Sequence, residues 1–206
     1  MSEVEYSHKA AEFVREYLDD INWRYYFDED NGVFRFDVGI EGKLSSIAYT
    51  IRVILGGIMI LAYCPIKPDS DNIKMMHATV EYINRINYAI TIGNLEMDHE
   101  DGEIRYRFFI GCDGGLPNNE AMKDGIDSGL YLYERIGEGL IGIIFKDMNV
   151  EQAFDSFKNS TKDRLIHKLG LSNLDELDPE LISMLESLLA DDEDDEDCNE
   201  EPETLN

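Results

Sequence analysis

The sequence has few cysteines, few basic residues and no long apolar run. Its three cysteines, Cys64, Cys112 and Cys198, match no zinc or redox spacing, and an odd number does not indicate a disulfide framework. No stretch of about 18 apolar residues occurs, so we expect no segment to span a membrane. The first ten residues, MSEVEYSHKA, lack the apolar core of a signal peptide. We therefore expect a cytoplasmic protein.

Basic residues are heavily outnumbered. The chain has 18 Lys and Arg against 44 Asp and Glu, which gives a formal net charge of −26. Residues 191–206 hold ten of the acidic residues and no basic one, and 34 acidic residues remain without them. An acidic surface repels nucleic-acid phosphates and anionic lipid head groups. We therefore expect neither nucleic acid nor a membrane as a partner.

The residue types of common catalytic and metal sites form no recognisable pattern. The four histidines are scattered without ligand spacing: His8, His77, His99 and His167. The sequence contains no P-loop, dinucleotide fingerprint or nucleophile elbow. Residues 28–32, DEDNG, resemble part of a calcium loop but lack the closing glutamate, so a turn is the better interpretation. We predict no catalytic residue, metal or cofactor, which favours a non-enzymatic protein.

Hydrophobic periodicity predicts three helices and six strands in the first 146 residues. Helical spacing of apolar residues indicates helices at 7–20, from about 70 to 87, and at 119–146. Alternation indicates strands at 23–28, 34–40, 46–55 and 58–64, and a hairpin at 94–111. The expected order is therefore α-β-β-β-β-α-β-β-α. Hairpin connections imply an antiparallel sheet of about five or six strands and an α+β fold class. The apolar runs 46–55 and 58–64 are expected at its centre, covered on much of both faces.

The third predicted helix is unusually rich in glycine. Its interior contains Gly125, Gly129, Gly137, Gly139 and Gly142. Each costs roughly 0.5–1 kcal/mol of helix stability relative to alanine, so a helix that keeps them needs close approach of its backbone to a neighbour. That neighbour is either the sheet of the same chain or a helix of a second copy, and the sequence leaves both open.

The C-terminal part differs in character. We divide the chain into an α+β domain at 1–146, a helical extension at 147–189 and a disordered acidic tail at 190–206. Asp178-Pro179 indicates the start of a short amphipathic helix with the stripe Leu181, Ile182, Leu185, Leu188 and Leu189. This helix could pack within the chain, close a dimer or dock in a partner's groove.

The block from Glu81 to Gly111 resembles the YbjN family. Asn87, Gly93, Asp101 and Gly102 are the strongest single matches, within the runs INRIN at 83–87 and IGNLEMD at 92–98. The element order extends the resemblance over about residues 5–146. The resemblance implies a fold like that of type III secretion chaperones, a homodimer, and a proposed bacterial regulator of sensory transduction without recognised catalytic residues. We expect Asn87 to cap its helix, and Gly93 to adopt a backbone angle closed to other residues.

One arrangement of charge suggests a binding surface. If Trp23, Phe34, Ile51 and Ile104 face the helices, the opposite sheet face carries Arg24, Arg35, Arg52, Arg105 and Arg107, with Tyr26 and Phe109 among them. One interpretation is cross-strand ion pairing with Asp28, Asp37, Glu96 and Asp98, which stabilises little at a surface. The other is a platform that receives an acidic or amphipathic peptide, from a partner or from the chain's own tail, because a guanidinium pairs with carboxylates and stacks on rings.

These observations favour a protein-binding module, chaperone-like or regulatory, with a protein or peptide partner. The alternative is a small-ligand sensor or small enzyme whose pocket lies between sheet and helices.

Overall fold

The computed structural model of the chain describes residues 5–168, with side chains as far as residue 160. The chain divides into two units at residue 160. The first contains the sheet, three helices and the start of a fourth; the second begins within that fourth helix. The predicted helix at 178–189 and the acidic tail at 190–206 lie outside the described residues.

The sheet is antiparallel and six-stranded, so the predicted α+β class is confirmed. Its strands are β1 (Tyr26–Asp28), β2 (Val33–Gly39), β3 (Ser46–Ile54), β4 (Gly57–Tyr63), β5 (Asn94–Met97) and β6 (Ile104–Gly111). They lie in the order β1-β2-β3-β4-β6-β5. The two strands β3 and β4 are therefore central, as the apolar runs predicted.

Burial of the two central strands corrects one expectation. Only β4 is buried along most of its length, including Leu61 on the side away from the main core. In β3, by contrast, burial alternates, and Ala48 and Arg52 are exposed. One face of the sheet is thus covered by helices, while much of the other is open to solvent.

The first strand is shorter than predicted. Trp23 and Tyr25 precede β1 and join no ladder, although their rings pack on Phe36 and Phe34 at centroid distances of 5.2 and 5.5 Å. The backbone NH of Trp23 instead donates to the carbonyl of Leu18 at the end of the first helix. This bond holds residues 23–25 near the helix, so they follow the sheet edge without pairing with it.

Four helices accompany the sheet: α1 (His8–Asp20), α2 (Ile73–Ala89), α3 (Asn119–Lys146) and α4 (Val150–Lys168). The bounds of α3 are those predicted. Helix α2 begins later than Ser70, because the Asn72 side chain caps it by accepting from the Met75 NH at 3.1 Å. His77 on α2 is exposed.

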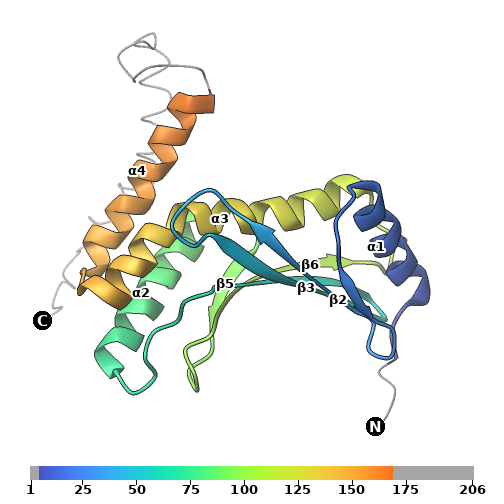
Figure 1. Cartoon of the computed structure of the whole chain (residues 1–206), viewed down its shortest axis with the longest axis horizontal. Coiled ribbons are helices and arrows are strands. Elements are labelled where there is room, and N and C mark those ends of the chain that lie inside the picture. Colours follow the sequence, from blue (N-terminus) through green and yellow to red (C-terminus); the bar gives the residue numbers. More distant parts are fainter. Residues whose placement is uncertain (1–4, 169–206) are drawn as a thin grey trace, which may run out of the picture. The chain divides into compact units, whose positions relative to one another are not determined.

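The glycines of α3 allow the helix to approach the rest of its own chain closely. Figure 1 shows α3 running along one side of the sheet. A Cβ added at Gly129 would lie 2.7 Å from the Tyr49 hydroxyl oxygen and 2.9 Å from the Tyr106 ring. At Gly125, a Cβ would lie 2.6 Å from a methyl of Ile60. Packing within the chain therefore explains these glycines, and the first of the two predicted explanations holds for them.

Buried tyrosines fill the space between sheet and helices. Tyr49, Tyr82, Tyr106 and Tyr133 are among the largest fully buried side chains. The Tyr49 hydroxyl donates to the carbonyl of Ile126 in α3 at 2.8 Å, so its buried oxygen has a partner. The interface of sheet and α3 is thus a packed core with satisfied hydroxyls.

Candidate protein-binding surface

The strand register places four of the five predicted arginines on one face of the sheet. Arg35 lies opposite Tyr26, and Arg52 lies opposite Met59, which in turn lies opposite Phe109. We define the open face as the side chains that the register puts on this side: Tyr26, Asp28, Val33, Arg35, Asp37, Ser46, Ala48, Thr50, Arg52, Ile54, Met59, Leu61, Tyr63, Asn94, Glu96, Arg105, Arg107 and Phe109. Phe34, Ile51 and Ile104 lie on the other side, buried in the core as predicted.

Arg24 lies apart from this set. It precedes β1, in the segment that joins no ladder, and its side chain is exposed. The short first strand therefore leaves Arg24 outside the paired register that defines the open face, while the other six predicted residues belong to it.

The two predicted aromatic residues are exposed on the open face. Tyr26 is 64% exposed and Phe109 is 50% exposed. The Phe109 ring lies over the backbone of Gly57, where an added Cβ would come within 2.5 Å of it. Phe109 is thus packed on one side and accessible on the other, which suits a residue that receives an apolar side chain.

Glu96 neutralises two of the arginines. The Arg105 Nε donates to Glu96 Oε2 at 2.9 Å, and an Arg107 guanidinium nitrogen lies 2.7 Å from Glu96 Oε1. Burial alone would raise the pKa of Glu96, but the hydrogen bond from Arg105 and the charge of Arg107 outweigh it and hold that pKa below its ordinary value. The carboxylate therefore stays ionised and both guanidinium groups stay engaged.

Neither Arg35 nor Arg52 is paired with a carboxylate as closely as Arg105 and Arg107 are. An Arg35 guanidinium nitrogen lies 3.8 Å from Asp28, at the limit of an ion pair. Arg52 is exposed, and it forms no ion pair with any residue of the described chain. Its neighbours across the ladder are Val33 and Met59, neither of them charged. The predicted ion pairing thus holds for three arginines, and Arg52 keeps a free cation on a partly apolar surface.

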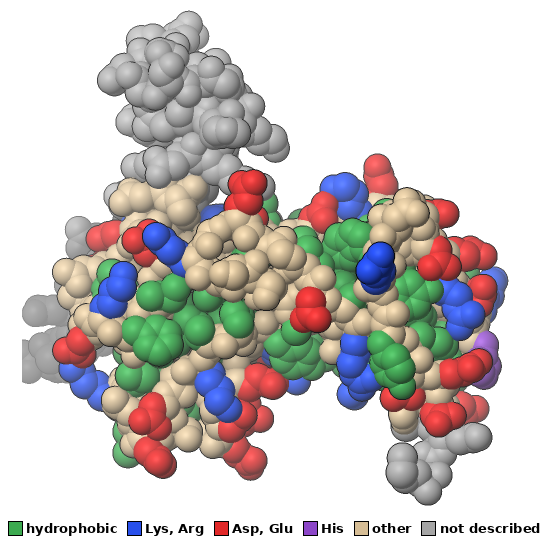
Figure 2. All heavy atoms as spheres, in the orientation of Figure 1, with side chains coloured by type: hydrophobic (Ala, Val, Ile, Leu, Met, Phe, Trp, Pro, Cys, Tyr) green, Lys and Arg blue, Asp and Glu red, His purple; other side chains and the backbone are tan. Residues whose placement is uncertain are grey.

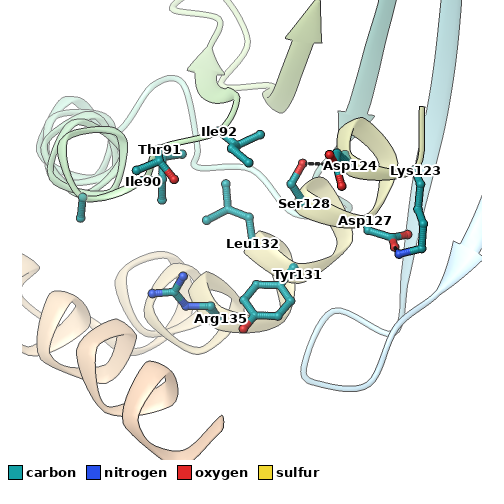
Figure 3. A pocket seen from close by; sticks show the side chains of 11 residues that line it. Ile90, Thr91, Ile92, Lys123, Asp124, Asp127, Ser128, Tyr131, Leu132 and Arg135 are labelled. Atoms are coloured by element: carbon teal, nitrogen blue, oxygen red, sulfur yellow. Dashed lines mark hydrogen bonds and ion pairs between the residues drawn. The ribbon is translucent and has the colours of Figure 1, made fainter. Parts of the chain in front are cut away.

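A second feature, which sequence reasoning missed, is a groove on the outer side of α3. It has a volume of about 370 Å³ and lies between the segment 89–92 and α3. Figure 3 shows Ile92 and Leu132 pointing toward each other across it, with Lys123 and Asp127 paired at one end. Only tertiary packing brings these segments together, so no local pattern could reveal the groove. It lies outside α3 rather than between the sheet and that helix.

No described side chain has the environment of a reactive thiol or a metal ligand. Burial raises the pKa of the Cys64 thiol to about 12, and burial also raises the pKa of Cys112. Within residues 5–160, no group of three or more His, Cys, Asp or Glu side chains could hold a metal ion. None of the described helices is long and apolar enough to cross a bilayer.

Comparison with known proteins identifies one family. Residues 10–138 match a family model described as "YbjN: Putative bacterial sensory transduction regulator". Among solved structures, the chain is similar to the crystal structure of YbjN from E. coli, described as "a putative transcription regulator". The two share 13% identity with a TM-score of 0.42, and the match covers 69% of this chain and 93% of that one. No curated protein sequence matches the chain.

Proposed function

Because the chain belongs to the YbjN family, whose description is that of a regulator, we propose that it is a non-enzymatic regulatory protein that binds a segment of another protein. The open face is the proposed binding surface. The observation that carries the proposal is the register of β1, β2, β3, β4 and β6, which gathers guanidinium groups and exposed aromatic rings on one uncovered side of the sheet.

The chemistry of the open face favours a partner segment with both carboxylates and apolar side chains. Guanidinium groups pair with carboxylates in a planar, two-pronged geometry, and they also stack on aromatic rings. Phe109 and Tyr26 supply exposed apolar area close to those cations. Aromatic residues and arginine are also the residue types enriched where proteins bind one another.

A charge-reversal experiment tests this proposal. The full chain, immobilised, would capture partners from bacterial lysate beside a variant with Arg52→Glu and Arg107→Glu. We expect a partner retained by the wild type to be lost from this variant and kept by an Arg24→Glu control, because Arg24 lies outside the paired strands. Equal retention by all three proteins would show that the open face is not the binding surface.

The proposal extends to assembly and location. We propose a cytoplasmic homodimer, as the family resemblance implies. Sedimentation equilibrium of the full chain would distinguish a dimer of about twice 23.6 kDa from a monomer. A single species at monomer mass across micromolar concentrations would contradict the proposed dimer. It would leave the proposed binding surface unaffected.

A second candidate function is small-ligand sensing, and the groove beside α3 favours it. Its volume of about 370 Å³ falls in the range of ligand pockets, roughly 300–1,000 Å³. Ile92 and Leu132 would contact the apolar part of a ligand. A metabolite screen by thermal shift, comparing the wild type with Leu132→Ala, tests it. If a metabolite raises the melting temperature of the wild type and of Leu132→Ala equally, its binding site lies outside this groove.

A further inference from the structure

We propose that the segment bound on the open face is an amphipathic α-helix that sets one carboxylate against Arg52 and two apolar side chains against Met59 and Phe109. This inference rests on the proposed function and adds the conformation and residue spacing of the partner. We call these three side chains the Arg52–Phe109 row, because they occupy matching positions on β3, β4 and β6.

The spacing of the row follows from the register. Arg52 lies opposite Met59, and Met59 lies opposite Phe109. Neighbouring strands are about 4.8 Å apart, so the row spans about 5 Å from its first to its second position and about 10 Å from its first to its third.

An α-helix reproduces this spacing on one of its faces. The helical rise of about 1.5 Å per residue places position i+3 or i+4 about 5–6 Å along the axis and position i+7 about 10.5 Å along it. Side chains at these positions share one face of the helix. An extended peptide places same-face side chains at multiples of about 6.6 Å, which match neither distance well. The row therefore fits a carboxylate at position i and apolar residues at i+4 and i+7.

Arg52 is the position at which a new carboxylate gains most. Arg105 and Arg107 already bind Glu96, and Arg35 lies beside Asp28, so a carboxylate there would have to compete. Arg52 has no such competitor among the described residues, and its apolar neighbours leave its charge poorly compensated. Pairing at Arg52 therefore displaces only water.

The surroundings of the row supply an apolar floor. Val33 and Leu61 belong to the open face, yet each is only 3% exposed, and neither is part of the main core. Met59, two residues before Leu61 on β4, is partly exposed, and Phe109 is half exposed. A helix laid over the row would add its apolar side chains to this small second cluster.

The charge of the whole molecule limits the number of carboxylates in the partner. Acidic side chains are spread over the visible surface in Figure 2, with basic ones scattered between them. A segment with many carboxylates would be repelled by this surface. The Arg52–Phe109 row therefore suits a helix whose contacting face has one carboxylate and is otherwise neutral. It does not suit a run of acidic residues.

Binding of designed peptides to the full chain tests this inference. The probe is a fluorescein-labelled, alanine- and glutamine-based helical peptide with Glu at position i and Leu at i+4 and i+7. One control peptide moves the Glu to i+2, on the opposite face, at the same composition. A second replaces the Glu with Lys, and a third contains prolines that prevent a helix. The proteins are the wild type, Arg52→Glu, Phe109→Ala and, as a control outside the paired strands, Arg24→Glu.

We expect the wild type and Arg24→Glu to bind the Glu probe at least tenfold more tightly than any control peptide. Arg52→Glu should bind the Lys peptide more tightly than the Glu probe. Phe109→Ala should bind both of these peptides more weakly than the wild type does. If the i+2 or proline peptide binds as tightly as the probe, and Arg52→Glu still abolishes binding, the helical spacing is wrong while the binding surface stands. If no peptide binds the wild type more tightly than the variants, the helix is overturned, and the lysate experiment then decides the proposed function separately.

Discussion

At the scale of single residues, the Tyr133 hydroxyl takes part in the hydrogen bonding of the sheet itself. It accepts from the Tyr106 backbone NH at 3.0 Å and donates to the Ala62 carbonyl at 2.9 Å. Ala62 and Tyr106 are register partners on β4 and β6. Burial raises the pKa of Tyr133 well above its ordinary value, so this hydroxyl stays protonated and keeps its donor. One side chain of α3 thereby joins the helix to the centre of the sheet.

Replacing Tyr133 with phenylalanine should therefore cost about 2–3 kcal/mol of unfolding free energy. The change leaves one buried NH and one buried carbonyl without this partner, and each such group costs about 1–3 kcal/mol. Urea denaturation of the full chain measures the loss. Tyr88→Phe on α2 is the matched control, because Tyr88 is 82% exposed, and it should change stability by less than about 0.5 kcal/mol. Equal stabilities of the two variants would mean that the sheet closes its own hydrogen bond when the hydroxyl is absent.

At the scale of elements, Asn87 joins helix α2 to the edge strand β5. It was expected to cap the end of α2, but the structure corrects this: its side chain accepts from the Leu95 NH at 2.8 Å and donates to the Leu95 carbonyl at 2.9 Å. The amide thus bonds to Leu95 as a neighbouring strand would. An unprotected edge strand invites pairing with another chain, and Asn87 closes this one at its centre.

Removing this amide should loosen β5 selectively. In Asn87→Ala, we expect the Leu95 amide to exchange with solvent at least tenfold faster, and unfolding free energy to fall by about 1–3 kcal/mol, because two backbone groups lose their partner. Amide hydrogen exchange by NMR measures the first effect. Asn84→Ala is the control, since Asn84 is exposed on the same helix. Unchanged exchange at Leu95 would contradict the role assigned to Asn87.

Patterns local in sequence predicted most of the fold. Alternation in the second arm of the hairpin 94–111 and in 34–40 gave the correct facing of Arg35, Arg105 and Arg107, because side chains in a strand alternate strictly. Gly93 adopts the expected positive φ of 70°. Features that depend on distant contacts were missed or misread. The bond that keeps residues 23–25 out of β1 is accepted by the Leu18 carbonyl, and the partner of Asn87 lies eight residues away across a loop.

For the open face, too, local patterns predicted one part of the arrangement, and tertiary contacts determined the rest. Alternation predicts which residues share the face, but it does not predict which cations are free. That depends on the register between β5 and β6, which brings Glu96 to both Arg105 and Arg107. Without that register, Arg52 could not be told apart from the other arginines.

At the scale of the whole molecule, charge opposes folding as well as association with other acidic chains. The described ion pairs are few and mostly exposed, so they contribute little each. A net charge of −26 over 206 residues means that the folded state brings many like charges together. Self-repulsion of this kind lowers the stability of a compact state, and salt screens it.

Added salt should therefore stabilise this protein. Between 0.01 and 0.15 M NaCl the Debye length falls from about 30 to 8 Å, which removes most repulsion between distant carboxylates. We expect the melting temperature to rise by about 2–4 °C, corresponding to about 1 kcal/mol for a chain of this size. A chain ending at residue 190 carries 34 acidic residues in place of 44, so its rise should be smaller. Differential scanning calorimetry measures how the melting temperature of each chain depends on salt concentration. A melting temperature that falls with salt would mean that the ion pairs, including those around Glu96, contribute more to stability than the repulsion takes away.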